Sequence, residues 1–146
     1  MVLAVSGAVA TSVLFATDAF FAFAGWRLLL ARRTWGRECV RKLHAYTERR
    51  TPFFASIAIL CTMLVAISSG FSHPRAGCLA GGASMALVAY GLVYARTACL
   101  VQQFKSAPVG SAEWHTRAGK LEAAMVTRAS LQAAALICIV AAALVS

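Results

Sequence analysis

Five polar side chains lie inside long apolar segments of this sequence, where each is costly to bury: Asp18, Tyr90, Tyr94, Arg96 and Arg128. An acid within a membrane span is expensive unless it is paired, so Asp18 requires a partner. Arg96, Arg128 and the two phenols are the candidates. Tyr90 and Tyr94 are four residues apart and would share one helix face. The expected role of Asp18 is an interhelical hydrogen bond or ion pair that fixes packing, a contact to a substrate, or plain exposure near the outer boundary of the membrane.

A second set of residues has the types that a general base requires. His44 and Glu48 are four residues apart, so the carboxylate could orient the imidazole. The same spacing also suits a solvent-exposed ion pair. His115 directly follows Trp114 and is the other candidate base. The sequence has no His, Cys and acid spacing typical of a metal site, so we expect neither a metal nor another cofactor.

The composition indicates the elements that must position these residues. Of 146 residues, 60% are apolar and 13% are charged, against roughly 45–50% and about 25% in an average soluble domain. This excludes a disordered chain and argues against an ordinary soluble domain. A helix that crosses a bilayer needs about 20 mostly apolar residues. Four segments qualify, at about 2–30, 52–69, 78–101 and 123–145.

Helices are also expected in the two long connectors, at 35–50 and 112–122. Pro52 would occupy an early position of the second span, where its missing N–H costs little. From Ala112 onward nothing breaks the helix, so the last span should project from the membrane. The sequence therefore predicts one all-α domain over 1–146, a four-transmembrane-helix bundle with a helical cap. The cap is either an amphipathic face against headgroups or the closure of a pocket.

The charge is distributed unevenly across the predicted spans. The net charge is +9, and every Lys and Arg of the fourteen except Arg75 falls on one side. The positive-inside rule assigns that side to the cytoplasm and both termini to the other side. The basic excess would attract anionic headgroups. It is an orientation signal and does not indicate a nucleic-acid site.

Several of these features occur together in one family. They are the aromatic second half of the first span, the segment Tyr46-Thr47-Glu48-Arg49-Arg50-Thr51-Pro52, the third span ending in Tyr94-Ala95-Arg96-Thr97, and the helix from Trp114 to Arg128 that leads into the fourth span. On these features the chain resembles the anthrone-oxygenase-like family of small four-helix membrane proteins. After the third span this chain reads Val101-Gln102-Gln103-Phe104, where that family often has a proline and an asparagine.

The resemblance implies oxidation of an activated aromatic methylene by dioxygen without metal or flavin, on a hydrophobic polyketide-type substrate. His44, oriented by Glu48, or His115 would then be the base. Arg128 or Arg96 would hold the substrate anion. Trp114, Tyr90 and Tyr94 would stack on the rings, and Asp18 would face the substrate.

Two other functions remain open from the sequence. The chain could be a non-catalytic small subunit of a larger membrane complex or a homo-oligomer, with Gly77-x-x-x-Gly81 as a contact surface. It could also be a small four-helix membrane transferase, whose usual signature is partly matched by Glu48-Arg49-Arg50.

Overall fold

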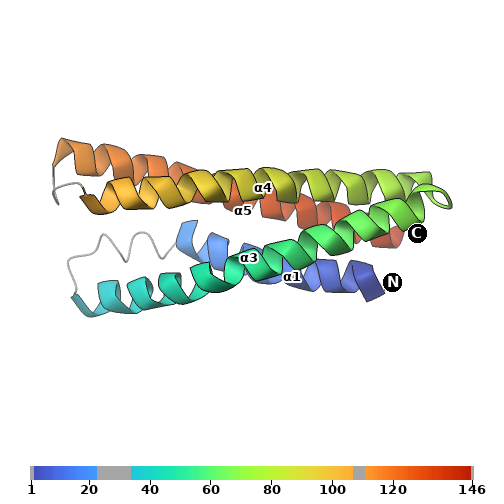
Figure 1. Cartoon of the computed structure of the whole chain (residues 1–146), viewed down its shortest axis with the longest axis horizontal. Helices are drawn as coiled ribbons and strands as arrows, with labels where there is room; N and C mark the ends of the chain where they lie inside the picture. The colour runs from blue at the N-terminus through green and yellow to red at the C-terminus, as the bar shows by residue number, and fades with distance from the viewer. Residues whose placement is uncertain (1, 23–33, 107–110, 146) are drawn as a thin grey trace.

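The structure is a computed structural model that describes residues 2–22, 34–106 and 111–145, with side chains described at 2–22, 49–103 and 111–145. Throughout these ranges the regular structure is helical, and it forms the predicted four-helix bundle (Figure 1). The helices are α1 (Val2–Phe20), α3 (Thr34–Gly70), α4 (Pro74–Ser106) and α5 (Ala112–Leu144).

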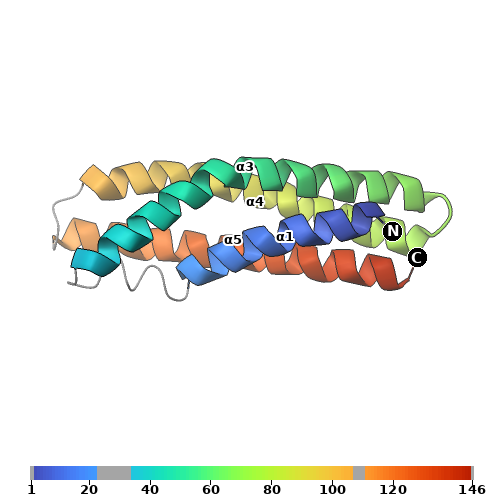
Figure 2. The same cartoon turned by 90° about the horizontal axis from the view of Figure 1, so that it is seen from below.

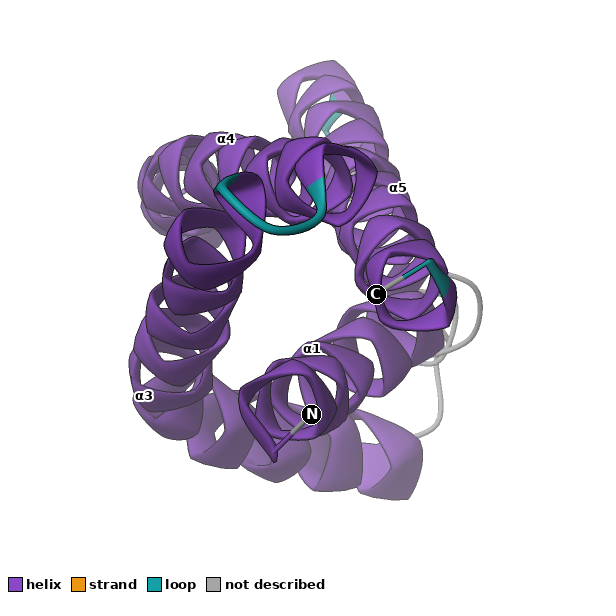
Figure 3. Cartoon of the chain, turned by 90° about the vertical axis from the view of Figure 1, so that its right-hand side faces the viewer, coloured by secondary structure: helices purple, strands orange, loops and turns teal. Residues whose placement is uncertain are grey.

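The helices pack in a ring in chain order. α1 packs against α3 and α5, and α4 packs against the same two helices from the other side. Figure 3 shows this ring from the end that carries both termini and the α3–α4 turn. We call this the terminal end, and the opposite end the connector end. Since chain neighbours are also spatial neighbours, α1 and α5 close the ring.

Each of the four helices contains a stretch long and apolar enough to cross a membrane: Val2–Phe20, Arg49–Gly70, Pro74–Gln103 and Ala112–Leu144. Large apolar side chains point outward from them, among them Phe53, Leu92 and Ile137. In water such a surface would aggregate, whereas in a bilayer it contacts lipid. The chain is therefore a multi-pass membrane protein.

The connector helix and the second span are one helix, which corrects the expected division at Pro52. α3 runs for 37 residues with Pro52 inside it, so this proline does not start a new helix. An interior proline removes one backbone hydrogen bond and commonly bends a helix without ending it, above all in membranes. Figure 2 shows α3 changing direction between its cyan beginning and its green second half.

The fourth helix agrees with the prediction, because α5 is continuous from Ala112 to Leu144. With 33 residues each, α4 and α5 are about 50 Å long, which exceeds the bilayer core of about 30 Å. Together with α3 they extend beyond α1 at the connector end (Figure 1). The end of the predicted first span, residues 23–30, lies outside the described residues.

The turn between α3 and α4 is short and tightly packed. The His73 amide donates to the Ser69 carbonyl at 2.7 Å, and α4 begins at Pro74, four residues before the start predicted for the third span. A proline fits the first turn of a helix, where its missing N–H has no partner to lose. A Cβ placed on Gly77 would lie 2.7 Å from the Gly70 Cα. Glycine at Gly77 therefore allows the two helices to approach closely.

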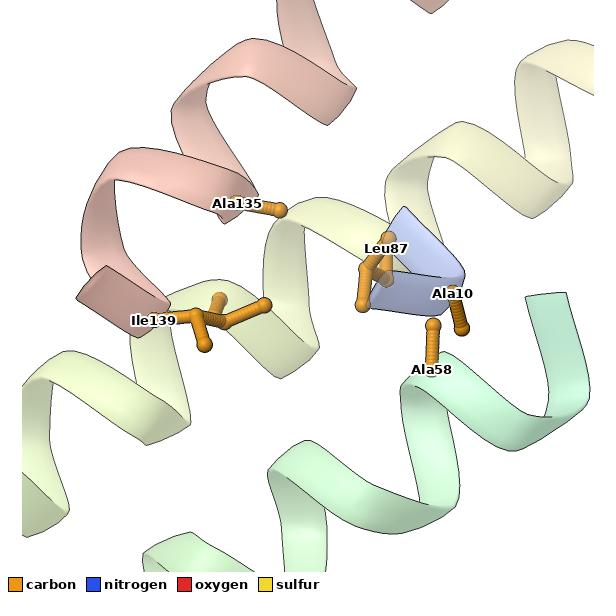
Figure 4. Packing of buried hydrophobic residues seen from close by; sticks show 6 residues of the cluster. Ala10, Ala58, Leu87, Ala135 and Ile139 are labelled. Carbon is orange, nitrogen blue, oxygen red and sulfur yellow. The ribbon is translucent and has the colours of Figure 1, made fainter. Parts of the chain in front are cut away.

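Small side chains fill the bundle interior next to the terminal end. Ala10, Ala58 and Ala135, from three helices, belong to one buried cluster with the larger side chains of Leu87 and Ile139 (Figure 4). We call these five residues, together with Ala83, the alanine layer. It separates the terminal end of the bundle from the polar residues deeper inside.

Candidate functional site

A buried ion pair joins the first and last helices. The Arg128 Nη2 atom donates to the Asp18 Oδ1 atom at 2.8 Å, and Arg128 Nε donates to Oδ2 at 3.2 Å. The two contacts use both carboxylate oxygens, which is the geometry that makes arginine–carboxylate pairs strong and directional. Both side chains are about 95% buried. Of the partners predicted for Asp18, the structure selects Arg128.

Two aromatic rings from α4 lie beside the guanidinium. The Arg128 Cζ atom is 4.8 Å from the Tyr94 ring centroid and 5.6 Å from that of Tyr90. Rings at these distances attract a cation through their negative faces. The Met125 sulfur, 3.7 Å from Arg128 Nη1, adds a soft acceptor. Helix α4 can supply both rings because Tyr90 and Tyr94 are one turn apart, as predicted.

Gln132 completes this group, one turn beyond Arg128 on α5, and is fully buried. We call Asp18, Tyr90, Tyr94, Arg128 and Gln132 the polar cluster. The Gln132 amide and the Tyr90 hydroxyl both face the Asp18 carboxylate. Both groups are close enough to the Asp18 carboxylate to interact with it, although neither makes a hydrogen bond of standard geometry with a described residue.

Unpaired polar atoms are unusual in a buried site, because each one costs roughly 1–3 kcal/mol. Three of them next to an ion pair leave donors and acceptors with which a further polar group could bond. The amide can donate and accept, the phenol can do the same, and the guanidinium can stabilise negative charge on an oxygen. The arrangement suits an oxygen function of a small molecule whose remaining surface is apolar.

The structure does not bring the other predicted site residues on α4 and α5 into this cluster. Arg96 and His115 are exposed. Trp114 is half-buried, and its ring meets that of His115 edge to face, with centroids 5.0 Å apart. His115 and Arg128 are separated by 13 residues of one continuous helix, about 20 Å along its axis. One reacting atom therefore cannot contact both.

The remaining predicted base, His44 with its partner Glu48, has side chains that lie outside the described residues. The backbone of both residues belongs to α3, in the part of this helix that extends toward the connector end. The Arg117 side chain, on the same helix as His115, donates hydrogen bonds to the Glu113 carboxylate and to the Gln103 carbonyl. In the described part of the chain no three His, Cys, Asp or Glu side chains gather closely enough to hold a metal ion.

Gln132 is the site residue that the sequence analysis did not select. Its signal was present, because Gln132 follows Arg128 by four residues and so shares its helix face. A glutamine inside an apolar span is also expensive without a partner. A second polar contact was equally overlooked: the Ser84 hydroxyl donates to Thr62 Oγ1 at 2.9 Å, linking α4 to α3.

No protein-family model, curated protein or solved structure matches this chain.

Proposed function

We propose that the chain is a membrane-embedded enzyme that oxidises an apolar aromatic substrate at an activated methylene with dioxygen. The observation that supports this proposal is the polar cluster, in which the Tyr90 hydroxyl and the Gln132 amide are buried beside the Arg128–Asp18 pair without a hydrogen bond of standard geometry. The reaction class comes from the resemblance to anthrone oxygenases, which rests on sequence features.

The reaction can be assigned to groups of this cluster. A methylene between two aromatic rings loses a proton to a carboxylate, and Asp18 is the carboxylate of the cluster. Asp18 would become neutral as the substrate anion replaces it as the partner of Arg128. The remaining electron pair delocalises onto the carbonyl oxygen of the ring system, whose negative charge Arg128, the Tyr90 hydroxyl and the Gln132 amide stabilise. The carbanion then reduces dioxygen. One oxygen atom becomes the new carbonyl and the other leaves as water with both methylene hydrogens, so that atoms and electrons balance.

The proposal includes an orientation in the membrane. The connector end, which carries the basic residues, would face the cytoplasm and its anionic headgroups. The terminal end would then lie on the opposite side. A substrate with a large aromatic body partitions into the bilayer and would reach the cluster from there.

The test uses the purified chain in detergent with anthrone, measuring oxygen uptake and quinone absorbance against protein-free micelles, because anthrones also oxidise spontaneously. We expect the wild-type chain to exceed this background, and Tyr90→Phe and Gln132→Leu to lower the excess rate by about tenfold or more, as for lost transition-state contacts. Lys120→Met, at an exposed position of α5, is the control and should retain the wild-type rate.

Two results would overturn the proposal. One is a wild-type rate equal to that of the micelles, with folding verified by the thermal transition. The other is wild-type activity in both cluster variants, which would place the reaction outside the cluster. Recovery of the chain solely in a stoichiometric complex with larger chains, inactive by itself, would instead support the subunit hypothesis.

A further inference from the structure

A hollow lies at the terminal end of the bundle, between α1, the last turns of α3 and the last turns of α5. Its volume is about 610 Å³, within the range of about 300–1,000 Å³ that small-molecule sites occupy. Its position is at the end of the ring that faces the viewer in Figure 3. None of its lining residues belongs to the polar cluster, so it is a separate feature.

The lining of this hollow is apolar toward the bundle axis and polar at one edge. Leu3, Val65 and Ile139 form part of the apolar wall. A smaller pocket shares these three residues and extends inward to Thr62. The polar edge consists of Ser68 and Ser69, in the last turn of α3. The hollow therefore has an apolar interior that reaches the bundle axis and a hydroxyl-bearing rim.

One positive charge of the terminal end follows the turn that begins at this rim. The hydrogen bond from the His73 amide to the Ser69 carbonyl fixes the α3–α4 turn directly beside Ser69. Arg75 follows in the first turn of α4 and is exposed. Among the described residues of the terminal end Arg75 is the one Lys or Arg, and no Asp or Glu accompanies it there. Arg75 does not line the hollow, but it is the described basic side chain of this end that is available to an anionic group bound there.

We propose that this hollow binds one acyl chain of an anionic phospholipid, with the lipid phosphate beside Arg75 and the serine hydroxyls. The four membrane spans place the hollow in the bilayer, where acyl chains are the surrounding solvent. The ends of the helices lie at the level of the headgroups, which is where Arg75 is found. The apolar lining matches the acyl chain of such a lipid, and the Arg75 cation matches its anionic headgroup. This inference does not depend on the proposed enzyme function.

The experiment is native mass spectrometry of the full chain in detergent, titrated with phosphatidylglycerol, with phosphatidylcholine of the same acyl chains, or with oleic acid. We expect one phosphatidylglycerol per chain, bound about fivefold more tightly than phosphatidylcholine, as one basic side chain near a membrane surface contributes. Arg75→Gln should abolish this preference. Since Arg75 is exposed, this variant should fold normally.

A second variant tests the hollow itself. Ala142 lines it and is 2% exposed, so Ala142→Phe should fill it and weaken the binding of both phospholipids by about tenfold, to the level of non-specific adducts. Ala134→Phe, on the exposed face of the same helix, is the matched control and should bind as the wild type does. The proposal is overturned if Arg75→Gln keeps the headgroup preference, if the two phenylalanine variants bind alike, or if oleic acid binds more tightly than phosphatidylglycerol.

Discussion

Three kinds of interaction meet at the Arg128 side chain: a two-point ion pair, two aromatic faces and a thioether. Transferring either charge from water into this interior is costly, and the attraction between the two offsets that cost only while both are present. The pair therefore holds α1 against α5, and each charge offsets the free-energy cost of burying the other. Removal of one partner should be more damaging than removal of both.

This asymmetry gives the first prediction. Arg128→Met should destabilise the bundle by about 3–5 kcal/mol, because Asp18 is left as an unpaired buried charge. The double variant Asp18→Asn with Arg128→Met should recover much of that loss. The measurement is the free energy of unfolding in detergent with increasing SDS, with Lys120→Met as the control for a lost exposed charge. A double variant that is less stable than Arg128→Met would contradict this account.

The second prediction separates a ligand contact from a structural one at Tyr90. Its hydroxyl is buried and makes no hydrogen bond of standard geometry in the described protein, so Tyr90→Phe removes a poorly satisfied group. The variant should be as stable as the wild type or more stable, by up to about 1–3 kcal/mol. Thermal unfolding in detergent measures this. Marked destabilisation would mean that the hydroxyl supports the fold itself, and a loss of activity in this variant could then not be assigned to the substrate.

At the scale of the elements, the α3–α4 hairpin depends on one close approach. Of the two glycines in the Gly77-x-x-x-Gly81 motif, Gly77 faces Gly70 across the turn, whereas a Cβ on Gly81 would have no atom within 4 Å. The motif therefore acts within the chain at Gly77. Its second glycine has no packing role in the described structure.

The third prediction follows from this difference. In Gly77→Ala the new Cβ would lie 2.7 Å from Gly70 Cα and 3.0 Å from Gly70 N, so the backbone must shift, at a cost of about 1–3 kcal/mol. Gly81→Ala should be neutral or slightly stabilising, since alanine is the better helix former. Unfolding of both variants in SDS measures the contrast. If the two substitutions changed the free energy of unfolding equally, the hairpin would have room for a Cβ atom at Gly77, and the prediction would be wrong.

Hydropathy and spacing predicted the elements well, and the contacts between them less well. Three features follow from rules that act locally: the length of the spans, the shared face of Tyr90 and Tyr94, and the need of Asp18 for a partner. These rules concern a single helix or a single depth in the membrane. The choice of Arg128 over Arg96 depends on how α4 and α5 rotate against α1, which local spacing does not determine. Pro52 was misjudged because its effect on a helix depends on the bundle around it. Gln132 was passed over because a neutral amide carries a weaker signal than a charge.

Across the whole molecule, the two ends of the bundle differ in charge. The terminal end has Arg75 as its one described Lys or Arg, whereas Arg49, Arg50, Arg117 and Lys120 lie toward the connector end. Residues 2 and 145 both lie at the terminal end. The proposed orientation places the connector end in the cytoplasm, because translocating many basic residues is disfavoured.

The fourth prediction tests this orientation with single cysteines in a background without the five native ones. Ser72→Cys, in the α3–α4 turn, should react in intact cells with a membrane-impermeant maleimide. Lys120→Cys, exposed on α5 toward the connector end, should react only after the membrane is opened. Both positions are exposed, so a difference in labelling reports the side of the membrane rather than burial. Labelling of Lys120→Cys in intact cells, with Ser72→Cys protected, would mean that the inverse orientation holds despite the charge distribution. In that case the connector end, with its basic residues, would face away from the cytoplasm.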